Sequence, residues 1–148
     1  MTTKGVIKAI SISKEKGIPK TNVPEAELKT DFGIVGDAHA AKWHRQVSLL
    51  AIESINKMIT KGATVSPGNF AENITTKNIE LTKLPVGTKF TIGPHSQLEV
   101  TQIGKECHNR CAIYEQAGDC IMPREGIFAK VTKGGLIQVG DTIEILYD

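Results

Sequence analysis

The chain has 148 residues, a length that fits one domain spanning residues 1–148. Its 18 basic and 16 acidic residues nearly cancel, which argues against nucleic acid or an anionic membrane surface as a partner. The N-terminus lacks the pattern of a signal peptide, and no apolar run approaches the ~20 residues of a membrane-spanning helix. We therefore expect a cytoplasmic protein whose cysteines are reduced.

The first predicted element is a strand over residues 6–13, VIKAISIS, because apolar side chains alternate there and β-branched residues dominate. Pro19 and Pro24 then exclude a helix interior, so turns and an edge segment are expected over the following residues. Gly33 and Gly36 mark a loop.

Residues 46–62 combine a short apolar strand with the one clear longer helix. Gly62 stands where a left-handed C-terminal cap is expected. The helix prediction depends on apolar residues at helical spacing, namely Ile52, Ile55, Met58 and Ile59.

The second half of the chain has the turn signals of a β protein. Residues 84–103 predict a hairpin that turns at Gly93-Pro94. A short helix is expected over residues 111–119, followed by two strands joined by Gly134-Gly135. Many short strands and few helices predict a mainly β fold, either a β-barrel or a curled antiparallel sheet.

Two loops carry polar residues that suit a site. GIVGDAH offers Asp37 and His39 as an acid/base pair or ligand contacts. An ordinary turn whose aspartate bonds to its own backbone is the simpler interpretation. PGNFAENI offers Asn69, Glu72 and Asn73, where asparagine and glycine also suit left-handed turns.

All three cysteines of the chain lie between Gly104 and Gly126, at Cys107, Cys111 and Cys120. With His108 they number enough ligands for zinc, but their spacing is unlike that of zinc knuckles. Cys111 and Cys120 also suit buried apolar positions. Cys107 lies among charged residues, and its positive neighbours favour the reactive thiolate; these are Lys105, His108 and Arg110.

Five stretches in order, GIVGDAHA, RQVSLL, PGNFAENITT, LPVGTKFTIG and GIFAKVTKGGLIQVGDTIEI, resemble a MOSC domain. The family is named for the C-terminal domain of molybdenum cofactor sulfurases, and the resemblance runs from Val6 to Ile145. It implies a β-barrel of MOSC type with a few short helices. It also implies a link to molybdenum cofactor (molybdopterin), a pterin dithiolene that holds molybdenum. Sulfurases of the family carry a separate pyridoxal-phosphate module, which we do not expect here, and no pyridoxal-phosphate lysine can be assigned.

The resemblance gives Cys107 the role of persulfide carrier or molybdenum ligand, with Cys111 as the alternative ligand. The lead-in Gly104-Lys105-Glu106 departs from the arginine and proline usual in the reductase members. Four cationic residues would favour the thiolate and attract the pterin phosphate: Lys105, His108, Arg110 and Arg124. Four more are expected to line the pocket: Asp37, His39, Asn69 and Asn73.

Three hypotheses follow, and they leave open whether the chain is an enzyme. In the first, it binds molybdenum cofactor or carries sulfur for it, with a cysteine desulfurase or a molybdoenzyme as partner. In the second, it is a molybdenum-dependent reductase of N-hydroxylated compounds. That enzyme needs a separate electron-transfer protein, because the chain has no four-cysteine iron–sulfur pattern and no flavin fingerprint. In the third, it is a small zinc or redox protein.

Overall fold

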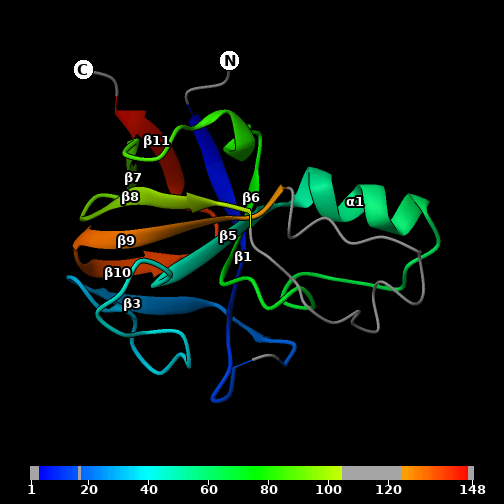
Figure 1. The fold of residues 1–148 in the computed structure, drawn as a ribbon, viewed down its shortest axis with the longest axis horizontal. Helices are drawn as coiled ribbons and strands as arrows, with labels where there is room; N and C mark the ends of the chain where they lie inside the picture. The colour runs from blue at the N-terminus through cyan, green and yellow to red at the C-terminus, as the bar shows by residue number, and fades with distance from the viewer. Residues whose placement is uncertain (1–3, 17, 105–124, 147–148) are drawn as a thin grey trace.

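The computed structural model describes residues 4–16, 18–104 and 125–146. These residues form eleven strands, one α-helix and one 3-10 helix, arranged as in Figure 1. In chain order the elements are β1 (Lys4–Ile12), β2 (Thr21–Val23), β3 (Glu25–Lys29), β4 (Gly33–Ile34), β5 (Val47–Ala51), α1 (Ile52–Thr60), β6 (Ile74–Lys77), η1 (Leu81–Lys83), β7 (Lys89–Ile92), β8 (Ser96–Ile103), β9 (Ile127–Lys133), β10 (Gly135–Gln138) and β11 (Thr142–Leu146).

Seven of the strands close into a barrel. Hydrogen-bonded neighbours follow the order β11-β7-β8-β9-β5-β6-β1, and β11 also pairs with β1, so the sheet returns on itself. β2 extends the sheet by pairing with the last residues of β1. A second sheet has the order β10-β3-β4, and β10 follows β9 directly through Gly134. The mainly β fold and the barrel are therefore confirmed.

β5 is buried on both of its faces, which explains why four of its five residues are apolar. All five of its residues are 8% exposed or less. Val47 and Leu49 join the barrel core, whereas Leu50 joins a second apolar cluster with Ile55 and Met58 of α1. β5 pairs in parallel with β6, a pairing that requires a long crossover, and this crossover holds α1 and the loop of residues 61–73. Figure 1 shows α1 projecting to one side of the barrel.

The helix prediction is confirmed with one difference. Ile55 and Met58 face inward, and Gly62 takes the left-handed conformation with φ of 100°. Ile59, however, is 49% exposed. It follows Met58 by one residue, a rotation of about 100° around the helix, so it turns away from the face that packs on the barrel.

The other predicted elements are found with small changes. The strand near the N-terminus and the hairpin of β7 and β8 are confirmed. The C-terminal stretch forms three strands rather than two, because β10 leaves the barrel to pair with β3. The helix predicted over residues 111–119 lies outside the described residues. Among the described residues, no helix has the length and apolar character needed to cross a membrane.

Candidate functional site

The two residues that bracket the cysteine segment meet at one end of β8 and β9. The backbone N–H of Gly104 donates to the carbonyl of Gly126 over 2.6 Å. Gln102 lies opposite Phe128 in the register of these strands, and its side-chain amide donates to the Gly104 carbonyl over 2.7 Å. The segment therefore leaves and re-enters the barrel at one place. The predicted site residues between these ends lie outside the described residues: Lys105, Cys107, His108, Arg110, Cys111, Cys120 and Arg124.

A pocket of about 180 Å³ lies beside this junction. Arg45 lines it, donates from Nε to the Gln102 side chain over 3.1 Å, and lies 5.2 Å from the Phe128 ring. The Lys16 ammonium lies 4.8 Å from the centre of the Trp43 ring. Two cations held against aromatic faces favour an anionic ligand. The described residues that line it are Lys16, His39, Trp43, Arg45, Ser48, Ala71 and Phe128.

A buried ionic cluster contacts His39, one of the residues that line this pocket. The side chains of Lys20 and Asp37 are 0% exposed, and the Lys20 ammonium lies 2.8 Å from Asp37 Oδ1. The same ammonium lies 2.9 Å from Ser13 Oγ and 3.0 Å from His39 Nδ1. Asp37 also accepts the backbone N–H groups of Ser13 and His39. The turn interaction expected for Asp37 is present, and a long-range ion pair is added to it.

The charge state of Asp37 follows from these contacts. Burial alone would raise the pKa of its carboxyl, because an anion loses solvation. Hydrogen bonds and charge attraction from Lys20, with the N–H groups of Ser13 and His39, outweigh burial and lower the pKa below its ordinary value. Asp37 is therefore an anion that neutralises the Lys20 ammonium.

Asn73 joins three strands rather than opening onto the pocket. Its Oδ1 accepts the Ser48 backbone N–H over 3.0 Å, and its Nδ2 donates to the Ser11 carbonyl over 3.1 Å. Ser48 is one of the pocket residues, and its hydroxyl donates to Asn73 Oδ1 over 3.2 Å. Asn73 thus holds Ser48 in place from behind.

Asn69 and Glu72 organise the loop before β6. Asn69 Oδ1 accepts the Ser66 N–H over 2.9 Å, which closes the turn. Glu72 is fully buried and accepts the N–H groups of Gly68 and Phe70 and the hydroxyl of Thr75. Burial raises the pKa of Glu72 despite these hydrogen bonds. The left-handed residues of the loop are Gly68 and Ala71, not the asparagines.

The structure thus brings His39 to the pocket wall, places Asp37 and Asn73 one layer behind, and places Asn69 in the supporting loop. Sequence reasoning missed Lys16, Lys20, Trp43, Arg45 and Phe128. The stretch KWHRQV, which follows the GIVGDAH loop, carried a signal for Trp43 and Arg45, since aromatic and cationic residues beside a candidate loop suit a binding wall. Nothing local pointed to Lys20, which is 17 residues from Asp37.

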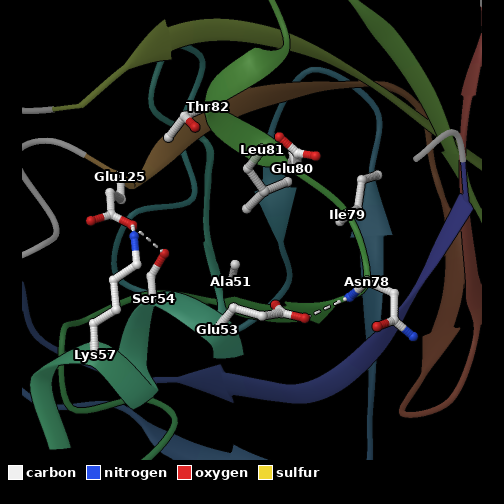
Figure 2. Close-up of a pocket in the computed structure, with 10 residues that line it drawn as sticks. All are labelled: Ala51, Glu53, Ser54, Lys57, Asn78, Ile79, Glu80, Leu81, Thr82 and Glu125. Carbon is white, nitrogen blue, oxygen red and sulfur yellow. Dashed lines mark hydrogen bonds and ion pairs between the residues drawn. The ribbon is translucent and has the colours of Figure 1, made fainter. Parts of the chain in front are cut away.

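A second pocket, of about 300 Å³, lies at the start of α1 and is drawn in Figure 2. Glu125 accepts hydrogen bonds there from Ser54 and Lys57, over 2.7 and 2.9 Å. Glu53 accepts the backbone N–H of Asn78 across the same pocket. Three glutamates and one lysine line it, so its charge disfavours an anionic ligand. The lining residues are Ala51, Glu53, Ser54, Lys57, Asn78, Ile79, Glu80, Leu81, Thr82 and Glu125.

Comparison with known proteins places this arrangement in a family. The family model described as the MOSC domain matches residues 36–144, which include most of the barrel, all lining residues of the smaller pocket except Lys16, and the cysteine segment. The chain belongs to the MOSC domain family. A search of curated proteins found no match to the sequence. This family is associated with molybdenum cofactor, so the chain is a member of a molybdenum-cofactor-related domain family.

Solved structures support the MOSC fold. The YuaD protein from Bacillus subtilis is 18% identical with a TM-score of 0.77, and the match covers 100% of this chain and 99% of that one. YiiM from Geobacillus stearothermophilus is 17% identical with a TM-score of 0.70, over 97% and 75% of the two chains. YiiM from Escherichia coli is 17% identical with a TM-score of 0.67, over 97% and 70%. At these identities the likeness shows a shared fold.

Proposed function

We propose that this MOSC protein binds molybdenum cofactor, or carries sulfur for it, through a thiolate at Cys107. One observation supports this proposal above all others. The ends of the segment that contains Cys107 meet at Gly104 and Gly126, beside a pocket lined by Arg45 and Lys16. A reactive cysteine and an anionic pterin both need cationic surroundings, the first to stabilise its thiolate and the second to bind.

The described residues fit the anionic part of a pterin cofactor. Typical ligand pockets measure about 300–1,000 Å³. The pocket here has a volume of about 180 Å³, so its described walls would enclose a group of phosphate size rather than a whole pterin. Arg45 is suited to a phosphate oxygen because its guanidinium offers several N–H donors in one plane. In this proposal, the predicted residues between Gly104 and Gly126 would make the contacts to the rest of the pterin.

Each described residue has a distinct part in this proposal. Arg45 and Lys16 would bind the anionic group, and Phe128 would keep Arg45 oriented from behind. Trp43, parallel to His39 with ring centres 6.5 Å apart, would exclude water from one side of the pocket. Molybdenum cofactor supplies a metal that accepts a thiolate ligand, and Cys107 would provide that thiolate. For sulfur transfer, the same thiolate would hold the sulfur as a persulfide.

Loading the purified protein with molybdenum cofactor tests the proposal. Bound molybdenum and pterin are measured in the wild type, Cys107→Ser, Cys111→Ser and Arg45→Gln, with Cys120→Ser as the matched control. We expect Cys107→Ser and Arg45→Gln to lose most of the bound cofactor and Cys120→Ser to keep it. Equal loading in wild type and Cys107→Ser would remove Cys107 from the ligand role, and loss in Cys111→Ser alone would move that role to Cys111.

Mass spectrometry of the protein from its native host separates the carrier function from the binding function. One added sulfur atom on Cys107 supports the carrier function, whereas co-purified pterin supports the binding function.

Metal analysis of the purified protein tests the zinc alternative. Tightly held zinc, lost only when two or more cysteines are changed, would overturn both functions in favour of a zinc protein. The described residues hold no group of three histidine, cysteine, aspartate or glutamate side chains suited to a metal. Turnover of an N-hydroxylated substrate by the loaded protein with an added reductase would identify the reductase instead.

A further inference from the structure

Strand β8 contains a β-bulge near its end. Val100 pairs with Ala129 across the sheet, and both belong to the barrel core. The next pair is Gln102 with Phe128, which makes Thr101 the extra residue of the bulge. Because side chains alternate along a strand, Gln102 would point into the barrel core if the bulge were absent. The bulge turns it to the outer face, where Phe128 lines the smaller pocket.

The loop that carries Arg45 contacts this bulge at two points. The Thr101 hydroxyl donates to the backbone carbonyl of His44. The Gln102 side chain accepts from Arg45 Nε over 3.1 Å and donates from its own amide nitrogen to the Gly104 carbonyl over 2.7 Å. A row of hydrogen bonds therefore runs from a pocket cation to the residue at which the cysteine segment leaves the barrel.

The chemistry of its two partners fixes how the Gln102 amide is turned. Arg45 Nε only donates, so it must meet the amide oxygen. The Gly104 carbonyl only accepts, so it must meet the amide nitrogen. An ionised glutamate would offer acceptors alone, a lysine would offer donors alone, and a methionine would offer no strong partner for either group. The bridge between Arg45 and Gly104 therefore depends on a glutamine.

The Arg45 guanidinium has donors beyond the one that Gln102 uses. It carries several N–H groups in one rigid plane, and Nε supplies the contact to Gln102. Among the residues that the structure describes, no other group accepts a hydrogen bond from Arg45. Its Cζ lies 5.2 Å from the centre of the Phe128 ring. Because the plane is rigid, an anion on the Nη groups and the contact on Nε constrain the same orientation.

We propose that Gln102 is a positioning residue that couples the Arg45 guanidinium to the backbone of Gly104, so that an anion bound by Arg45 also stabilises the start of the cysteine segment. Such coupling is reciprocal, so fixing Gly104 strengthens anion binding by the same factor. The anion that suits a guanidinium best is one that bears a phosphate group. This part rests on the proposed function, whereas the link from Arg45 to Gly104 exists in the unloaded protein.

Amide hydrogen exchange of the unloaded protein tests the coupling without a ligand. The Gly104 rate is measured by NMR in wild type, Arg45→Met, Gln102→Met and the double variant, relative to amides of β5. We expect each single change to speed exchange about two- to tenfold, the ratio that one hydrogen bond is worth. The double variant should match Gln102→Met. An effect of Arg45→Met that is absent, or equally large without Gln102, would overturn the proposal.

Two further variants separate the bridge from a general effect on the fold. Gln97→Met makes the same change at the other end of β8 and should leave the Gly104 rate unaltered. Gln102→Glu keeps an acceptor for Arg45 but loses the donor to the Gly104 carbonyl, so Gly104 should exchange as fast as in Gln102→Met. A wild-type rate in Gln102→Glu would show that the amide donor does not hold Gly104, and the proposal would be wrong.

Titration with inorganic phosphate then tests the anion. In wild type, the Arg45 Nε–H signal and the Gly104 amide signal should shift along one saturation curve. In Gln102→Met, the Arg45 signal alone should shift, and an unchanged response of Gly104 would refute the coupling while the anion site stands. If phosphate shifts neither signal in wild type, the anion site and the proposed function fail, and the exchange rates alone decide whether Gln102 links Arg45 to Gly104.

Discussion

Lys20 and Asp37 form an ion pair that is closed to solvent. The two side chains are 0% exposed and lie 2.8 Å apart. A buried pair of this kind adds little net stability compared with apolar residues, yet removing one partner leaves an unpaired buried charge. The pair therefore fixes the position of its neighbours, and the GIVGDAH loop is held to the segment before β2.

Lys20→Met should destabilise the protein by about 3–5 kcal/mol, because it leaves the buried Asp37 carboxylate without its positive partner. Urea denaturation followed by circular dichroism measures the change. Lys16→Met, an exposed lysine of the same segment, should stay within about 0.5 kcal/mol of wild type. Similar stabilities for the two variants would show that the ion pair does not hold this part of the fold.

The acid sensitivity of the protein should depend on Asp37. Its pKa is lowered in the folded protein below the ordinary value of 3.8, so its contribution is fully present above about pH 3.8 and is lost as the pH falls through the lowered pKa. Asp37→Asn should therefore be much less stable than wild type at neutral pH, and the difference should shrink below about pH 3.8. Denaturation curves at a series of pH values measure it, and a constant difference would contradict the assignment.

At the scale of elements, the loop of residues 66–73 connects the pocket to the barrel. Its Gly68 lies against the segment that carries Lys20, since the Lys20 N–H donates to the Gly68 carbonyl over 2.8 Å. Its Asn73 reaches Ser48 of β5 and Ser11 of β1. The motif PGNFAENI therefore supports both the ion pair and a pocket wall.

Gly68→Ala should disrupt this loop severely. Gly68 has φ of 97°, and a β-carbon there would collide with the Lys20 carbonyl oxygen. Gly62 is the matched control, because its φ is 100° but a β-carbon there would meet no atom within 4 Å. We expect about 1 kcal/mol of destabilisation for Gly62→Ala and more than about 2 kcal/mol for Gly68→Ala. Equal effects in chemical denaturation would mean that the close approach to Lys20 is unimportant.

The sequence predicted the strands and the helix, but it did not predict which side chains contact one another in the candidate site. The alternation in β1, the apolar run of β5 and the helical spacing of α1 are local patterns, and the structure confirms them. Lys20 was missed because nothing within a few residues distinguishes a buried lysine from an exposed one. Its burial depends on Asp37 and Ser13, which only the folded chain brings to it.

At the scale of the whole molecule, the barrel depends on a pairing between the two ends of the chain. β1 and β11 pair with Gly5 opposite Ile143, and Figure 1 shows the start of β1 and the end of β11 at the same end of the molecule. The alternating apolar pattern predicted both strands, but no local pattern indicates that they pair with each other. An open curled sheet therefore remained an alternative to the barrel. The family resemblance, carried by ordered motifs over the whole chain, was the stronger guide to closure.

Ile143→Ala tests the importance of this seam. Ile143 is 1% exposed and lies between β1 and β7, opposite Gly5 and Ile92. Its truncation should cost about 2–5 kcal/mol, the usual range for a buried aliphatic residue. Leu146→Ala, in the same strand but 41% exposed, should cost less than about 1 kcal/mol. Thermal and urea unfolding measure both variants. Equal losses of stability would mean that the packing of Ile143 between β1 and β7 contributes little to the stability of the barrel.

The hydrogen bond between Gly104 and Gly126 has a consequence for how such a protein can change over generations. The barrel holds both ends of the connection together. The entropic free energy of closing such a loop depends only weakly on its length and rises by about 0.6 kcal/mol for each doubling. Residues can be inserted, deleted or exchanged between these two glycines while the strands on either side keep their register. The connection between these glycines can therefore take up changes in length and side chains without a change in the barrel that supports it.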